Sequence, residues 1–367
     1  MEAYNTKKKA VICIAAGKSQ VPLIKKAKSL GYIVIAVDGN PDAPGFRDAD
    51  VCVRVSTHDA VAIIEELELL QDNYHWLGVL NRSAGPPVIT AAKLCEHFKI
   101  PGVPIKSATT LVNKDMLRTF CTGYDIPLAN FELFSVSDGH SFRRMELPFV
   151  VKPALSLVGK SGVTVVRSND CLDPAIKNAV ANAVNGRVVI EDYLPGPDFS
   201  LISFAQDGIL HPLCFLEELN QEDEGGQVIA VGFKTCSMSE KGSREQEAQE
   251  ISKELINIFG INRSALMVSF RADSNGRLML IEVHLDLGGD LLIEQVFPVA
   301  LPYDFLELAI NLLVGNKVIP YNTSVKPTAI LYNRGESAEA VRNQEKFRLI
   351  TAESDQSLNQ KLRERGL

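Results

Sequence analysis

Several features that would assign this chain of 367 residues to a class of protein are missing. Its seven cysteines are scattered and never form a Cys-x-x-Cys pair, which argues against a zinc site and against a disulfide framework. This pattern favours a reducing, cytoplasmic compartment. No targeting segment is visible, and the apolar run Ala10–Ala16 is too short to span a membrane, so it is interpreted as a buried strand.

An excess of positive charge is also missing. Lys and Arg number 38 against 45 Asp and Glu, which gives a net charge of -7. We therefore expect neither a nucleic acid nor a membrane as a partner. The rest of the composition is ordinary, with 46% hydrophobic and 23% charged residues, and indicates a globular protein of two or three domains.

The glycine-rich motifs of two nucleotide folds are absent at the first strand-to-helix turn. Gly17-Lys18-Ser19 is similar to the end of a P-loop, but that motif needs glycine at position 12, where the sequence has Ile12. Gly17 also stands alone where a dinucleotide fold has three glycines, although Asp38 lies at a suitable distance for a ribose contact. An ordinary α/β turn is favoured, and a nicotinamide-dependent enzyme stays a minor hypothesis.

The sequence does have an alternation of short apolar runs and amphipathic stretches before a boundary near Pro101–Pro104. This alternation predicts a parallel α/β sheet. Its strands are expected at Ala10–Ala16, Ile33–Val37, Val51–Val55 and Trp76–Leu80. Ligands of such a sheet gather at the carboxyl ends of the strands.

The middle of the chain has a different pattern. Two strands flanking Leu155–Gly162 are expected to form a hairpin, and a helix and a strand after it complete a small lid. The acidic run Glu217–Gly225 is predicted to be a mobile loop. Beyond it we expect the helix Arg244–Phe259 and two strands, Ala265–Ala272 and Leu278–Leu285.

Lysine ends one of these apolar strands. Lys152 follows Phe149-Val-Val, and strand alternation places it on the same face as Val150. A buried ammonium needs an anion, and a nucleotide phosphate is one candidate. The alternative, a lysine that reaches the surface from an edge strand, is the better one for Lys152 taken alone.

Three more segments carry polar groups at strand ends. The turn Lys160–Gly162 offers an ammonium and backbone N–H groups to phosphates, with a plain hairpin as the alternative. The strand exit Ile190–Gly196 offers backbone groups to a purine edge, or is simply a capped strand end. Glu282 and His284 share one face of a late strand and indicate a magnesium–nucleotide site or, equally, a solvent-exposed face.

Taken in order, these motifs resemble the ATP-grasp superfamily, which includes biotin carboxylase, carbamoyl-phosphate synthetase and the amino-acid ligases. The resemblance covers Ala10 to Gly315. It implies an α/β fold with an N-terminal parallel-sheet domain at residues 1–105, before an ATP-grasp domain at 106–320. Within the latter, an α+β lid is implied at about 148–192, and residues 321–367 are left as a short C-terminal element.

The resemblance also implies roles for single residues, with ATP and Mg²⁺ (or Mn²⁺) as cofactors. The implied ATP ligands are Lys114, Lys152, Lys160, Ser161, Gly162, Glu191, Asp192, Tyr193, Leu194 and Asp198. Glu282 and His284 are the implied metal ligands, and Lys160 and Arg271 the catalytic residues. The substrate candidates are Arg82, Ser83, Gly288 and Gly289. Arg82 follows a strand end and is suited to a carboxylate, although an ordinary loop arginine is an equal alternative.

Three positions depart from the family's pattern. Its late strand ends in Glu-x-Asn-Pro-Arg, whereas this chain has Glu282-Val-His284-Leu-Asp286. His284 thus replaces an asparagine that binds metal, and Asp286 replaces an arginine with a charge of opposite sign. Ser269 stands where the family has another metal-binding carboxylate.

The predicted function is an ATP-dependent ligase that joins a carboxylate to an amine through an acyl phosphate, with small molecules as both substrates. Three explanations of the altered positions compete. The metal site is rebuilt around His284, or Arg271 or Lys234 replaces the missing cation. In the third, the chain binds nucleotide without efficient ligation. The last option, a degenerate ATP-grasp protein, is the alternative function. Related ligases are often dimers, so a homodimer is one option.

Overall fold

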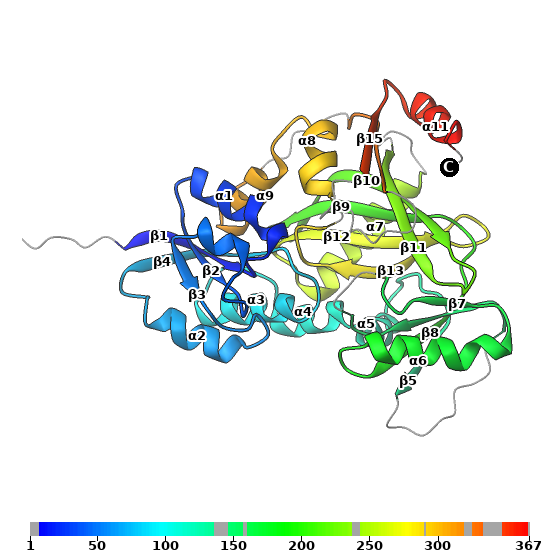
Figure 1. The fold of residues 1–367 in the computed structure, drawn as a ribbon, viewed down its shortest axis with the longest axis horizontal. Helices are drawn as coiled ribbons and strands as arrows, with labels where there is room; N and C mark the ends of the chain where they lie inside the picture. The colour runs from blue at the N-terminus through cyan, green and yellow to red at the C-terminus, as the bar shows by residue number, and fades with distance from the viewer. Residues whose placement is uncertain are drawn as a thin grey trace, which may run out of the picture.

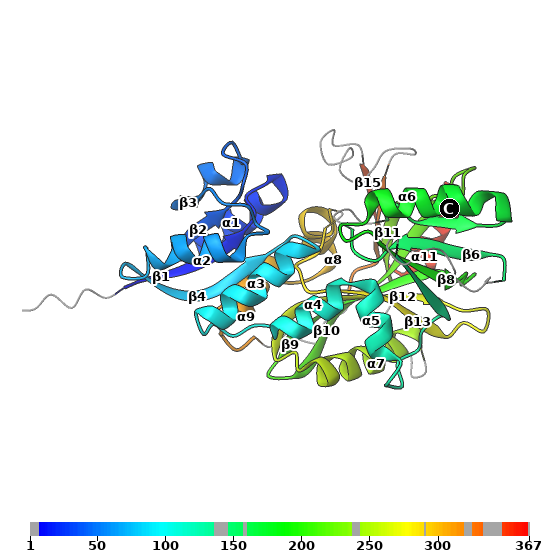
Figure 2. The ribbon, with the colours of Figure 1, turned by 90° about the horizontal axis from the view of Figure 1, so that it is seen from below.

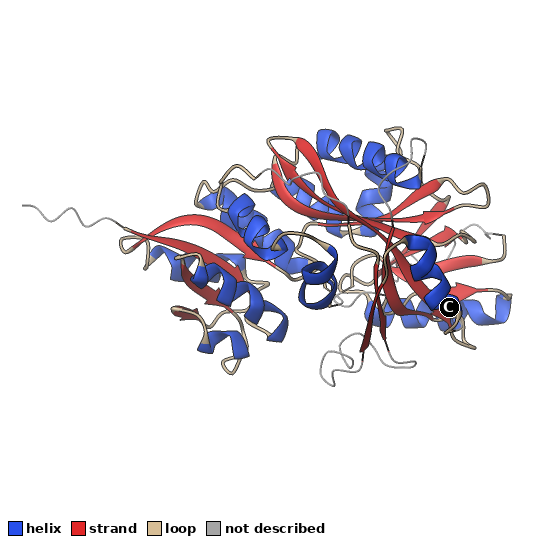
Figure 3. Cartoon of the chain, turned by 90° about the horizontal axis from the view of Figure 1, so that it is seen from above, coloured by secondary structure: helices blue, strands red, loops and turns tan. Residues whose placement is uncertain are grey.

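The computed structural model describes residues 7–135, 146–156, 160–236, 243–289, 291–318, 325–332 and 347–365. The described strands form three sheets, two of four strands and one of seven. One four-stranded sheet occupies one end of an elongated molecule, and the other two sheets lie toward the opposite end (Figures 1 and 3).

The first sheet is parallel, with the strand order β3-β2-β1-β4. Its strands are β1 (Lys8–Ile14), β2 (Ile33–Val37), β3 (Val51–Val53) and β4 (Tyr74–Asn81), and its helices are α1 (Val21–Ser29), α2 (Ala60–Glu68) and α3 (Pro86–His97). Side chains of β1 enter two separate apolar clusters, one on each face, which explains its continuous apolar sequence. The predicted parallel α/β sheet is confirmed.

The second sheet has seven strands in the order β13-β12-β9-β10-β11-β14-β15, and every pair within it that is described by register is antiparallel. The strands are β9 (Asp198–Gln206), β10 (Ile209–Glu222), β11 (Val228–Cys236), β12 (Arg263–Ala272), β13 (Leu278–His284), β14 (Thr328–Tyr332) and β15 (Phe347–Thr351).

Both faces of this sheet are covered, because β9 alternates between two cores. Leu201 and Ala205 pack under α4 (Ile105–Val112), α5 (Lys114–Cys121) and α7 (Arg244–Phe259). Ile202 and Phe204 point to the other face, toward η5 (Leu292–Val296), α8 (Phe297–Ala300) and α9 (Phe305–Leu313). Figure 2 shows α4, α5 and α7 on one side of the sheet and α8 on the other.

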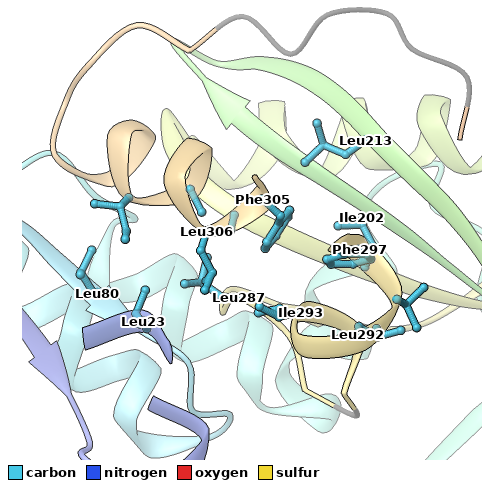
Figure 4. Close-up of a cluster of buried hydrophobic side chains, with 14 of the residues drawn as sticks. Leu23, Leu80, Ile202, Leu213, Leu287, Leu292, Ile293, Phe297, Phe305 and Leu306 are labelled. Atoms are coloured by element: carbon cyan, nitrogen blue, oxygen red, sulfur yellow. The ribbon is translucent and has the colours of Figure 1, made fainter. Parts of the chain in front are cut away.

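One apolar cluster joins the parallel sheet to the seven-stranded sheet. Leu23 and Leu80 from the N-terminal part meet Leu287, Ile293 and Leu306 from the later part (Figure 4). All of these side chains are buried. Apolar burial of this kind contributes about 25 cal/mol for each Å² removed from water, so the cluster holds the two parts together.

The third sheet contains the segment predicted as a lid and is called the lid here, although it begins before the predicted residue 148. Its antiparallel strands are β5 (Phe131–Ser135), β6 (Phe149–Pro153), β7 (Thr164–Val166) and β8 (Arg187–Asp192), and α6 (Leu172–Asn182) packs on one face. The predicted hairpin is confirmed by the pairing of β6 with β7. Residues 157–159, which fall within the predicted Leu155–Gly162 connection, lie outside the described residues, as do residues 136–145.

The prediction of a mobile loop at Glu217–Gly225 is wrong. Strand β10 continues to Glu222 and pairs with β9 on one side and β11 on the other. Its acidic side chains find basic partners on both faces, since Glu217 pairs with Lys234 at 2.9 Å and Glu222 with Arg167 at 2.8 Å. Partners distant in sequence therefore make an acidic strand stable.

For the C-terminal residues 321–367, the sequence analysis predicted a short element without naming its strands or helices. Strands β14 and β15 extend the seven-stranded sheet beyond β11, and α11 (Asp355–Arg363) packs beside them through Leu358 and Leu362. The predicted boundaries at 105 and 320 stay predictions. No single helix in the described ranges is long and apolar enough to cross a membrane, although the bent pair Leu292–Ala300 and Phe305–Leu313 meets that test jointly.

Candidate functional site

A cavity of about 1300 Å³, measured with its open mouth, lies between the lid and the seven-stranded sheet. Its walls come from β6, β7 and β8 of the lid, from β9, β10, β12 and β13, and from the chain around the start of α3 and the junction of α4 with α5. A cavity that is lined by apolar side chains and several convergent charged groups is the natural candidate for a small-molecule site.

Most of the predicted site residues line this cavity. They are Lys114, Lys152, Lys160, Glu191, Asp192, Leu194, Asp198, Arg271, Glu282 and His284. Ser161, Gly162, Tyr193, Arg82, Ser83, Gly288 and Gly289 are not in its wall. Asp286 and Ser269, the departures from the family pattern, are in the wall, and so is Glu218, which the sequence analysis had placed in a loop.

One buried charged group in the cavity wall is a carboxylate held between two cations. Glu191 accepts from Arg118 Nε through one oxygen and from Lys152 Nζ through the other. All three side chains are at most 6% exposed. The sequence analysis missed Arg118, because its partner lies 73 residues away in the chain.

Burial and pairing shift the pKa values in this cluster. Burial lowers the pKa of Lys152 to about 8, although Glu191 pulls it upward. Burial would raise the pKa of Glu191, but Arg118 and Lys152 outweigh it, and this pKa lies below its usual range. Glu191 is therefore an anion that fixes the position of Lys152 at the cavity wall.

A second charged group lies on β13. The two oxygens of Glu282 accept from Lys114 Nζ at 2.7 Å and from His284 Nε2 at 3.1 Å. Burial would lower the pKa of His284, but Glu282 and then Asp286 outweigh it and raise this pKa to about 9. Burial would likewise raise the pKa of Glu282, yet Lys114 and His284 hold it well below its usual range.

The divalent ion that the resemblance implies does not fit the predicted pair of ligands. Both oxygens of Glu282 already accept from basic side chains, and one of those side chains is His284 itself. Ser269, which lies opposite Glu282 in the β12–β13 register, has no carboxylate to add. Within the described residues, no group of three or more His, Cys, Asp or Glu side chains could hold a metal ion.

Lys160 ties the lid to the seven-stranded sheet. Its ammonium donates to Asn220 Oδ1 at 2.6 Å and lies 3.0 Å from Glu218 Oε2, both on β10. The backbone N–H of Val165 also donates to Gly226 O at 2.8 Å. The lid is thus closed over the cavity by contacts with β10 and with the turn that follows it.

Ser161 and Gly162 serve this turn rather than the cavity. Ser161 Oγ bonds to Asn182 Oδ1 of α6 at 2.6 Å. Gly162 has a φ of 76°, and a Cβ there would lie 2.8 Å from that of Asn182. The glycine is therefore required by the close approach of the turn to α6.

We expect Glu218→Gln to loosen the lid, because Lys160 then loses a carboxylate partner. Such partly buried pairs contribute about 1 kcal/mol, so hydrogen exchange of the β7 amides should accelerate about fivefold. Glu217→Gln is the matched control, because Glu217 pairs with Lys234 instead. Equal exchange in the two variants would contradict the assignment of Glu218 to the lid.

The predicted substrate role of Arg82 is not supported by its position. Its side chain is 1% exposed and makes a two-point ion pair with Glu294, at 2.6 and 2.9 Å. Its Nε donates to Gly288 O at 3.0 Å, and Gly288 N–H donates to Asp286 Oδ1. Arg82 and Gly288 thus join the parallel sheet to the turn after β13, and neither of them is in the cavity wall.

The segment predicted to hold a nucleoside is shaped by Arg271. This side chain donates from Nε to Leu194 O at 2.8 Å and lies 3.4 Å from Asp198. Its guanidinium is also 5.4 Å from the centre of the Tyr193 ring. Of the two candidates for the missing cation, Arg271 lines the cavity, whereas Lys234 pairs with Glu217 outside its wall.

Comparison with known proteins gives a family for the centre of the chain. Residues 112–264 match the phosphoribosylglycinamide synthetase, ATP-grasp (A) domain. A phosphoribosylamine–glycine ligase from Halalkalibacterium halodurans is 26% identical over 51% of this chain and 44% of its own length. A formate-dependent phosphoribosylglycinamide formyltransferase from Trichormus variabilis is 27% identical over 68% of this chain and 63% of its own length. The alignments thus leave more than a third of each relative unmatched.

Solved structures share the fold over nearly the whole chain. An L-amino acid ligase from Bacillus licheniformis, 17% identical, superposes with a TM-score of 0.76 over 98% of this chain and 96% of the other. An N5-carboxyaminoimidazole synthetase from Staphylococcus aureus complexed with ADP, also 17% identical, has a TM-score of 0.72 over 93% and 87%. The resemblance predicted from the sequence is confirmed, since residues 112–264 match an ATP-grasp domain and the whole chain shares the α/β fold of these solved structures.

Proposed function

We propose that the chain is an ATP-dependent ligase that joins a small-molecule carboxylate to an amine. The observation that carries the proposal is the meeting of Lys114, Lys152 and Lys160 in one cavity, although they come from a helix start, a strand end and a turn. Preorganised cations of this kind neutralise transferring phosphates. The names of the relatives, a glycine ligase and a formate-dependent enzyme, support the same chemistry.

The proposed reaction has two steps. A carboxylate oxygen of the substrate attacks the γ-phosphorus of ATP, and the bond to the β-phosphate oxygen breaks to release ADP. The amine nitrogen then attacks the acyl carbon, the carbon–oxygen bond breaks, phosphate leaves and the nitrogen loses a proton. The chain's contribution is positioning and charge neutralisation by the three lysines.

We propose ATP as the cofactor, with a divalent ion (Mg²⁺ or Mn²⁺) that accompanies its phosphates and neutralises part of their charge. The purine and ribose are assigned to the Asp192–Asp198 segment under the lid, where Leu194 and Asp198 line the cavity. We also propose a cytoplasmic location, since all seven cysteines are free thiols. A homodimer stays a prediction.

One assay tests the function. The protein is incubated with ATP, Mg²⁺, and pools of carboxylates and amines, and ADP and phosphate are measured. Release that needs both a carboxylate and an amine is expected. The alternative, a degenerate protein that binds nucleotide without turnover, is favoured by the acidic Asp286 in the cavity wall. Tight ATP binding without substrate-dependent release would establish that alternative instead.

We expect the ATP affinity of the free protein to fall above about pH 8. The pKa of Lys152 is lowered by burial from 10.5 to about 8, so its positive charge is lost from pH 8 upward, while the ATP phosphates keep theirs. The decline should approach about tenfold per pH unit, measured by calorimetry. Lys152→Arg keeps its charge and should show a flat profile between pH 8 and about 9, where the next cation of the cavity, His284, begins to lose its proton. An equally steep decline in this variant over that range would contradict the assignment.

A further inference from the structure

The basic partners of Glu282 have a consequence for the number of metal ions at the proposed nucleotide site. We infer that Lys114 and His284 occupy the positions around Glu282 that a protein-bound divalent ion would need, so that the site holds only the ion that ATP itself carries. This inference rests on the proposed function, because it concerns the ATP site. It adds a count of ions that the function alone does not give.

The first support is the state of the Glu282 carboxylate. Lys114 Nζ lies 2.7 Å from one oxygen and His284 Nε2 lies 3.1 Å from the other, so each oxygen has its own basic donor. A divalent ion on this carboxylate would have to displace one of these donors. The displaced donor would lose a charge-assisted hydrogen bond inside a partly buried wall.

The second support is the shortage of other oxygen ligands near Glu282. Ser269 faces it across the β12–β13 pair, and its hydroxyl bonds to Ser200 Oγ at 3.0 Å. One oxygen of Asp286 accepts a hydrogen bond from the N–H of Gly288 at 2.7 Å, and its other oxygen lies 3.9 Å from His284 Nδ1. Magnesium demands about six oxygen ligands in a near-octahedral arrangement, which these residues do not supply.

The two supports point the same way. Where a metal-binding pair of carboxylates would leave negative charge for an ion to neutralise, this wall already carries its own cations, Lys114 and His284. ATP brings an ion bound to its phosphates, and such an ion keeps several waters and takes only one or two protein carboxylates rather than a full set of protein ligands. The site is therefore complete with a single ion.

The experiment counts Mn²⁺ ions by the paramagnetic resonance signal of the free ion, with and without a non-hydrolysable ATP analogue. Calorimetry measures binding of the analogue separately. We expect about one Mn²⁺ per bound analogue in the natural protein and no binding of Mn²⁺ alone. In the double variant Ser269→Glu with His284→Asn, about two Mn²⁺ per analogue are expected, because Glu282 gains a free oxygen and a second carboxylate. His58→Asn, at an exposed histidine, is the control and should keep one.

Two ions per analogue in the natural protein would overturn the inference and leave the proposed function intact. A single ion in the double variant would also overturn it, because Ser269 and His284 would then not be what excludes the second. If calorimetry detects no binding of the analogue under any metal condition, the proposed function fails, and the inference fails with it. Thermal unfolding of each variant shows that the counts refer to folded protein.

Discussion

Replacing Lys152 by methionine is expected to weaken ATP binding about a hundredfold. The lysine lines the cavity at the end of β6, and Glu191 holds it in place. A hydrogen bond from a charged group to a phosphate contributes about 1.5–3 kcal/mol, and each 1.4 kcal/mol is a factor of ten in affinity. Calorimetric titration with ATP measures the effect.

Lys177→Met is the control for this prediction, because Lys177 is exposed on α6 of the same lid. Its ATP affinity should match that of the natural protein. In Lys152→Met, Glu191 keeps Arg118 as a partner, so the fold should survive and the loss should appear in binding. An unchanged affinity in Lys152→Met would refute the assignment of Lys152 to the phosphates.

Replacing Glu191 by alanine is expected to destabilise the fold by about 3–5 kcal/mol. The change leaves Arg118 and Lys152 buried without their shared anion. Arg118 Nη1 already has no hydrogen-bond partner in the part of the chain that the structure describes. Without Glu191, this buried guanidinium would lose its anionic partner as well. Urea unfolding followed by circular dichroism measures the loss.

A triple variant separates the loss of charge pairing from the loss of packing. Glu191→Leu with Arg118→Leu and Lys152→Met replaces the buried charges by apolar side chains of similar size. Such replacements are often neutral or stabilising, so this variant should recover most of the stability lost in Glu191→Ala, while its ATP affinity stays about a hundredfold below that of the natural protein, as in Lys152→Met. If Glu191→Ala is as stable as the natural protein, the cluster does not support the lid.

Local elements were predictable wherever the pattern is periodic. The predicted bounds of the strand Ile33–Val37 and of the helix Arg244–Phe259 agree with β2 and α7. In the helix, Ser243 accepts from the N–H of Gln246, and Gly260 ends it with a φ of 59°, so both ends are marked by nearby residues. Burial of one face and capping depend on neighbours within a few positions, which the sequence displays directly.

The identity of the cavity's lysines was also readable from the chain, and their surroundings were not. Lys114, Lys152 and Lys160 were chosen from their places at element ends, and all three line the cavity. Arg82 was chosen in the same way, but its guanidinium forms an ion pair with Glu294, which lies 212 residues further along the chain. The sequence around an arginine at a strand end is the same whether its side chain binds a substrate or a carboxylate of the protein.

The sequence alone therefore settled the parallel sheet, the lid hairpin and the order of motifs that pointed to an ATP-grasp domain. The tertiary structure decided that an acidic stretch is a strand, that Glu191 sits between Arg118 and Lys152, and that His284 pairs with Glu282. The physical reason is the same in each case. Charge pairing depends on distance in space, and inside a protein it is strong enough to override what the neighbouring residues favour.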